Sequence, residues 1–211
     1  MNKYGKLTTG IIIAWFIFAL SASALHLFEN QSQRVGLAVA IAALTPIAIF
    51  FTWFLSSANF RQFTLSLNPQ ILTFAQTWRV IGFTFVLLEA HSVLPAIFAL
   101  PAGYGDMAIG VTATLVAWQL ADPRHRDSFI LWQALGITDL VMAVSFGTTA
   151  RLIAPHAPSM VAMTVLPLSL VPTFLVPLFL IFHVICIAQA RTWKVADLSR
   201  PKAMPLQNLV A

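Results

Sequence analysis

Six long apolar runs separated by short polar loops constrain this chain more than any other feature. A helix that crosses a bilayer needs about 20 mostly apolar residues, and six windows meet that requirement. The predicted spans lie near residues 10–28, 35–56, 71–92, 104–121, 129–149 and 161–188. Charged residues make up only 9% of the chain, against about a quarter in a soluble domain. The sequence therefore predicts an all-α, polytopic transmembrane helical bundle over residues 1–190.

The positions of Lys and Arg predict the orientation of this bundle. With the N-terminus inside, the inner segments hold nine of these residues and the outer loops hold two. The inner set is Lys3, Lys6, Arg61, Arg124, Arg126, Arg191, Lys194, Arg200 and Lys202, and the outer set is Arg34 and Arg151. The positive-inside rule then predicts that both termini (N-in/C-in) and a polar tail at 191–211 are cytoplasmic. Basic residues at span ends indicate membrane orientation, not nucleic-acid binding.

The first span has an alternative interpretation as a cleaved signal peptide. Lys3 and Lys6 precede the apolar run, and Ala22-Ser23-Ala24 resembles a cleavage site. Cleavage would leave five spans with the same orientation. We favour an uncleaved helix, because apolar residues continue through Phe28.

Three prolines at five-residue spacing interrupt the sixth predicted span. They are Pro167, Pro172 and Pro177. Each lacks an N–H group, so the carbonyls four residues earlier, at Met163, Leu168 and Thr173, lose their helical donors. In lipid those carbonyls need partners, so we expect this span to pack inward or to line a polar cavity. A kinked helix satisfied by its neighbours is the simpler alternative.

Ionisable groups inside the predicted spans are the main candidates for function. A charge at the bilayer centre costs about 2.5–3.5 kcal/mol on the lenient insertion scale. At a rise of about 1.5 Å per residue, Arg79 lies roughly 12 Å and Asp139 about 15 Å from the inner boundary. We expect these two to pair, with His183, Gln76 and Gln133 close by. Alternatively, Arg79 extends to the inner headgroups, and Asp139 is protonated or bonded to a hydroxyl.

A second polar group is predicted near the outer ends of the first and third spans. It comprises His26, Glu29, Glu89 and His91, with Asp106 at the start of the fourth span. The segment 101–106 is interpreted as a turn, where Asp106 either caps the new helix or forms an acidic entrance with Glu89. His26 and His91 are weak candidates for haem or metal ligands, and no other cofactor or metal is expected.

Cysteine usage and missing motifs limit the possible activities. The single cysteine, Cys186, excludes a disulfide framework, a CxxC pair and a thiolate metal cage within one chain. The sequence contains no HExxH, GxSxG or paired-carboxylate motif, which disfavours an intramembrane hydrolase.

Several stretches together resemble a group of uncharacterised bacterial multi-pass membrane proteins. They are 60–63, 76–79, 100–106, 132–140 and 166–174. The resemblance covers most of the chain after the second span and implies a bacterial cytoplasmic (inner) membrane location. It implies no activity and no site residues.

The leading hypothesis is a bundle whose polar cavity binds or passes a small solute, ion or proton. Arg79 and Asp139 would form its inner gate, His183 would titrate near neutral pH, and Asp106 with Glu89 would form the outer mouth. Two alternatives are an accessory subunit that contacts a membrane partner or a second copy of itself, and a haem-binding electron-transfer protein. Membrane lipid is an expected contact in every case.

Overall fold

The protein is a bundle of helices, and six of them are long and apolar enough to cross a membrane. The computed structural model describes residues 3–29 and 36–193, and within those ranges it contains helices and no strand. The candidate spans are Lys3–Ala24, Leu37–Ser56, Pro69–Ala90, Ala96–Gln119, Pro123–Ile153 and Val171–Thr192. This confirms the predicted all-α bundle of six spans. Residues 194–211 of the predicted tail lie outside the described residues.

Each of the first two spans is a single helix, and a short helix follows the second. These are α1 (Lys3–Ala24), α2 (Leu37–Ser56) and α3 (Ala58–Leu65). Ser57 caps α3 through a hydrogen bond from the Phe60 amide, and the Phe60 ring stacks on Trp53 at 3.9 Å between centroids. The short helix is therefore fixed against the end of α2.

The third span consists of two α-helical segments joined by a 3₁₀-helix. They are α4 (Pro69–Phe74), the 3₁₀-helix η1 (Ala75–Gly82) and α5 (Phe83–Ala90). Asn68 caps α4 by accepting a hydrogen bond from the Gln70 amide at 2.8 Å, and Pro69 occupies the first turn. Eight residues are a long run for a 3₁₀-helix, which usually spans three or four.

The fourth and fifth spans are α6 (Ala96–Gln119) and, after the short 3₁₀-helix η2 (Pro123–His125), α7 (Arg126–Ile153). The prediction of a turn at 101–106 was wrong, because α6 begins at Ala96 and continues through Pro101. Gly103 serves close packing: a Cβ there would lie 2.7 Å from Val86 Cγ2 and 3.0 Å from the Gly82 carbonyl oxygen. The glycines that resemble a turn in the sequence instead let α6 approach the third span.

The sixth span begins later than predicted because its proline-rich half is not α-helical. The 3₁₀-helix η3 (Met160–Thr164) precedes it, a π-helical segment η4 (Val171–Leu175) opens it, and α8 (Val176–Thr192) completes it. The Thr173 carbonyl, which Pro177 deprives of its helical donor, accepts a hydrogen bond from Trp15 Nε1 at 3.1 Å. One of the three predicted orphan carbonyls is thus satisfied by a neighbouring helix.

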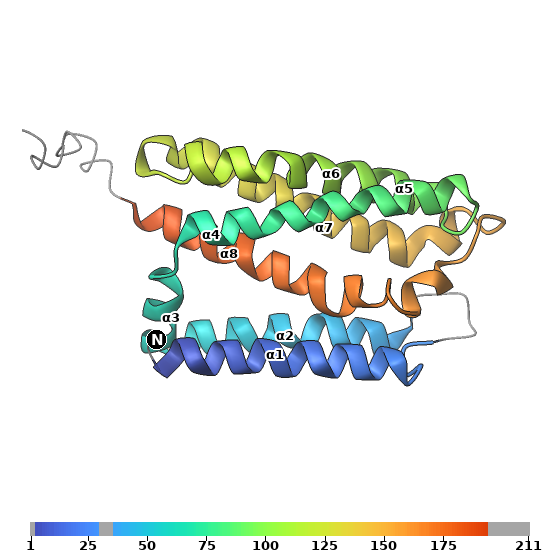
Figure 1. Ribbon diagram of the computed structural model, residues 1–211, viewed down its shortest axis with the longest axis horizontal. Helices are drawn as coiled ribbons and strands as arrows, with labels where there is room; N and C mark the ends of the chain where they lie inside the picture. Colours follow the sequence, from blue (N-terminus) through green and yellow to red (C-terminus); the bar gives the residue numbers. More distant parts are fainter. Residues whose placement is uncertain (1–2, 30–35, 194–211) are drawn as a thin grey trace, which may run out of the picture.

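The helices form an elongated bundle, with α1 and α2 on one side of α8 and with α5, α6 and α7 on the other (Figure 1). The start of α1, the helix α3 and the end of α8 lie at the same end of the bundle (Figure 1). A buried core at that end joins Phe50, Phe60, Phe129 and Ile185 from four different helices, α2, α3, α7 and α8. The first span therefore begins, and the last span ends, at the same end of the bundle, as an even number of spans requires.

Candidate functional site

The winding of the third span keeps a row of residues on one inward face. Thr73, Gln76, Arg79, Gly82 and Phe85 occur every third residue, and all five are buried. A 3₁₀-helix has 3.0 residues per turn, so residues three apart lie directly above one another. An α-helix would rotate such a row progressively away from the core, because it has 3.6 residues per turn.

Arg79 forms two ion pairs on one edge of its guanidinium group. Nε donates to Asp106 Oδ1 at 2.7 Å, and Nη2 donates to Asp139 Oδ2. The Arg79 side chain is 1% exposed, and each aspartate side chain is 16% exposed. The predicted contact between Arg79 and Asp139 is therefore present, with a second carboxylate beside it.

The other edge of the guanidinium contacts α7 and α8. Nη1 donates to the Gly136 carbonyl at 3.4 Å and contacts His183 Nε2 at 3.2 Å. His183 Nδ1 lies 2.5 Å from Gln133 Oε1, which only accepts hydrogen bonds, so the ring proton is assigned to Nδ1. Nε2 then accepts from Arg79. Four of the five N–H donors of Arg79 thus have partners.

The hydrogen bonds continue from His183 toward the start of α4. Gln133 Nε2 donates to Thr73 Oγ1 at 3.0 Å, and the Thr73 hydroxyl lies 3.8 Å from Cys186 Sγ. Cys186 Sγ in turn lies 3.9 Å from the Pro69 carbonyl oxygen. We define the Arg79 cluster as Arg79, Asp106, Asp139, His183, Gln133 and Thr73. Along the third span it extends from Arg79 in the middle to Thr73, about one turn from the start of that span at Pro69.

Two glycines make room for the charged and aromatic side chains of this cluster. A Cβ atom at Gly105 would overlap the Asp139 carboxylate, and one at Gly136 would overlap the His183 ring. Gly105 lies on α6 and Gly136 on α7, so side chains from α7 and α8 can cross closely over neighbouring backbones.

Asp106 is the candidate whose predicted position was wrong. We expected it at the outer mouth with Glu89, but it lies ten residues after the start of α6, or about 15 Å along the helix axis. Its carboxylate therefore reaches Arg79. Glu89 lies in the last turn of α5, half-buried, and takes no part in the hydrogen bonds of the Arg79 cluster described above.

Gln76 lies in the row of η1, close to Arg79 in sequence as expected, but its hydrogen bond goes to α8. Its amide nitrogen donates to the Phe179 carbonyl at 3.3 Å, and its buried Oε1 has no hydrogen-bond partner within the described residues. Gln76 therefore links η1 to α8 beside the cluster, without contacting Arg79.

The two histidines considered as haem or metal ligands lie outside the buried core. His26 is exposed after the end of α1 and contacts Glu29, and His91 is exposed at the end of α5. Within residues 3–29 and 36–193, no group of three or more His, Cys, Asp or Glu side chains could hold a metal ion. This geometry supplies no argument for haem.

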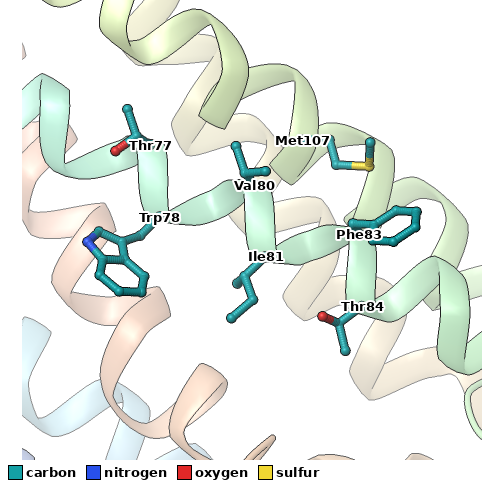
Figure 2. A pocket seen from close by; sticks show the side chains of 7 residues that line it. All are labelled: Thr77, Trp78, Val80, Ile81, Phe83, Thr84 and Met107. Carbon is teal, nitrogen blue, oxygen red and sulfur yellow. The ribbon is translucent and has the colours of Figure 1, made fainter.

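A shallow cleft of about 560 Å³ lies on the side of η1 away from Arg79. Figure 2 shows its lining, Thr77, Trp78, Val80, Ile81, Phe83, Thr84 and Met107. Six of these occupy the positions between the members of the buried row, so they face outward. Trp78 is 71% exposed, which suits a surface in contact with lipid. The cleft and the Arg79 cluster are thus on opposite faces of one helix.

The fold and the buried ion pairs define a multi-span helical membrane protein with a charged cluster inside its bundle. The chain belongs to the family described as a domain of unknown function (DUF8737), whose model matches residues 34–191. That region runs from α2 to α8 and contains every member of the Arg79 cluster, whereas α1 precedes it. No curated protein and no solved structure matches the chain.

Proposed function

We propose that this protein binds and passes a proton through the Arg79 cluster. The observation that carries the proposal is the ratio of charges: two carboxylates, Asp106 and Asp139, contact one guanidinium. With both carboxylates ionised and His183 neutral the cluster carries a net charge of −1, and with one proton bound it is neutral.

The surroundings of the cluster favour the neutral form. An uncompensated charge at bilayer depth costs about 2.5–3.5 kcal/mol even on the lenient scale, so a proton shared between the two carboxylates offsets a large penalty. Two carboxylates on one edge of a guanidinium also repel each other, as in other carboxylate pairs that share one proton. A proton, taken up and released, is therefore the species that this arrangement suits.

The size of the site also favours a proton over a larger solute. Arg79, Gln133 and His183 are buried and fill the space between the helices with mutual hydrogen bonds. Only the two aspartates keep partial exposure, at 16% each. The 3₁₀ segment η1 and the π segment η4 are the kinds of irregular winding at which membrane helices bend during transport.

Proton flux into proteoliposomes that contain a pH-sensitive dye tests this proposal. We expect Asp139→Asn and Asp106→Asn each to lower the flux at least tenfold, because neither variant can exchange the shared proton. Asp127→Asn is the matched control, since its carboxylate is 94% exposed at the start of α7. Equal flux in all three variants and in the unaltered protein would refute the assigned role.

An accessory subunit of a membrane complex is the second candidate. The four satisfied donors of Arg79 favour it, because such a cluster can also simply fasten helices together. Purification in mild detergent separates the two candidates. A stoichiometric partner protein supports the accessory role, and a stable lone protein with proton flux excludes it.

We also propose that the shared end of the bundle faces the cytoplasm of a bacterial inner membrane. The support is the excess of Lys and Arg at that end, including Lys3, Lys6, Arg61, Arg124 and Arg191.

A further inference from the structure

A second and larger cleft lies between α1 and α2 on one side and α3 and α8 on the other. Its volume is about 1080 Å³, slightly above the usual range for small-molecule pockets, about 300–1,000 Å³. The lining is almost entirely apolar, and small residues such as Ala19, Ala38 and Ala42 leave the space open. No member of the Arg79 cluster lines this cleft, so the two sites are separate, although Leu72 and Phe182, which adjoin Thr73 and His183 in the sequence, do line it.

The cleft exists because α1 is attached to the bundle only at certain points. At its start, Tyr4 stacks on Phe63 of α3, with the ring centroids 6.1 Å apart. Further along, Trp15 donates to the Thr173 carbonyl at 3.1 Å, and Ser23 accepts a hydrogen bond from Ser169 at 2.8 Å. The cleft runs along α1 from Gly5 and past the end of that helix to Phe28, between and around these attachments.

One end of the cleft is cationic. Lys6 follows Gly5, and Arg61 follows Phe60; both of these neighbours line the cleft, and both cations are exposed. Among the described residues 3–29 and 36–65, which include α1, α2 and α3, the one acidic residue is Glu29, and it lies at the opposite end of α1. The cationic end is also where the start of α1 meets α3 (Figure 1).

A polar group without a partner lies just inside this end. Thr8 Oγ1 is inaccessible to solvent and has no hydrogen-bond partner within the described residues, although Thr8 lines the cleft. A buried hydroxyl without a partner is costly, and after rotation of the Thr8 side chain into the cleft it can donate to an ester or phosphate oxygen. Along α1 the cation Lys6 therefore comes first, the hydroxyl of Thr8 second, and the apolar lining from Ile11 onward third.

We infer that the cleft binds an anionic phospholipid of the surrounding bilayer. Lys6 and Arg61 contact the phosphate, Thr8 donates to an oxygen at the level of the esters, and the acyl chains lie along α1 and α2. A phospholipid presents these three chemistries in the same order, and basic groups at the ends of spans attract anionic headgroups. The site differs from ordinary lipid contact because helices enclose it on two sides.

Native mass spectrometry of the full-length protein with palmitoyl-oleoyl phosphatidylglycerol tests the headgroup contacts. We expect one phosphatidylglycerol per chain, held at least tenfold more tightly than phosphatidylcholine with the same acyl chains. The Lys6→Gln/Arg61→Gln variant should bind phosphatidylglycerol roughly 25-fold more weakly, at about fivefold per cation removed. Arg124→Gln/Arg191→Gln is the control for net charge and should bind like the unaltered protein, because these exposed residues lie at the same end beside α7.

Filling the cleft tests where the acyl chains lie. Thr45 lines the cleft, and its hydroxyl is already bonded to the Ile41 carbonyl at 2.7 Å, so Thr45→Phe adds bulk without breaking a contact between helices. Thr138→Phe on α7 is the matched control, because Thr138 makes the same kind of bond to the Ala134 carbonyl outside the cleft. We expect lipid retention to be lost in Thr45→Phe and kept in Thr138→Phe.

Three results would overturn the inference. They are equal retention of the two phospholipids, equal binding by the Lys6→Gln/Arg61→Gln variant and its charge control, and unchanged retention in Thr45→Phe. A lipid-free dimer that Thr45→Phe dissociates would assign the cleft to a second copy of the chain instead. Proton flux plays no part in these measurements, so they succeed or fail independently of the proposed function.

Discussion

The charge balance of the Arg79 cluster predicts an uncommon order of stabilities among aspartate variants. If one proton is shared by Asp106 and Asp139, replacing either aspartate with asparagine leaves one guanidinium facing one carboxylate. The cluster stays neutral, and the new amide oxygen still accepts from Arg79. Each single variant should therefore lose only about 1 kcal/mol, the usual scale for one altered hydrogen bond.

The double variant Asp106→Asn/Asp139→Asn should behave differently. It leaves the Arg79 guanidinium, 1% exposed, without a counter-charge. Removing the partner of a buried charge costs about 3–5 kcal/mol, which exceeds the roughly 2 kcal/mol expected from two independent single changes. The predicted non-additivity of about 1–3 kcal/mol lies within the range measured for residues that share one network.

Equilibrium unfolding in mixed detergent micelles, followed by circular dichroism, measures these three free energies. Asp127→Asn again serves as the exposed control, with no expected change. A double variant equal to the sum of the two singles would contradict the shared proton. Single variants that each cost as much as the double would contradict it as well, because one remaining carboxylate would then stabilise the Arg79 guanidinium no more than none.

Three further predictions follow from separate contacts. Gly105→Ala should destabilise the protein by about 1–3 kcal/mol in thermal unfolding, because its Cβ overlaps Asp139, whereas Gly10→Ala, with no atom within 4 Å, should be neutral or stabilising. Trp15→Phe should cost about 1–2 kcal/mol in the same assay, since it leaves the Thr173 carbonyl without its donor. The predicted orientation places Ser159 outside and Asp122 inside. In intact cells, Ser159→Cys should therefore react with a membrane-impermeant maleimide and Asp122→Cys should not. The native Cys186 is buried and should not react.

The sequence predicted the spans and the central ion pair because both depend on distance along a helix. Counting residues from the span boundaries placed Arg79 and Asp139 at similar depths, and the cost of a lone charge in lipid then favoured their pairing. His183 and Gln133 were placed near them by the same count. The functions assigned to these residues stay predictions.

Asp106 was misplaced because a local signal conflicted with the tertiary structure. The residues Pro101, Gly103 and Gly105 are typical of a turn, whereas the structure uses these glycines to bring α6 against its neighbours. The rotation of the third span could not be predicted with an α-helical period either. A signal was present in the recurrence of Thr73, Gln76, Arg79 and Gly82 at every third position, which matches a 3₁₀-helix and not an α-helix.

An arginine side chain only donates hydrogen bonds, and this fixes the donor-to-acceptor direction of the chain of hydrogen bonds that starts from Arg79. Because Arg79 cannot accept, His183 must present a bare nitrogen to it, and Gln133 must turn its oxygen toward the ring and its nitrogen toward Thr73. The direction of these hydrogen bonds is therefore fixed. Arg79 determines both the tautomer of the His183 ring and the orientation of the Gln133 amide, and neither can invert alone while the guanidinium stays in place.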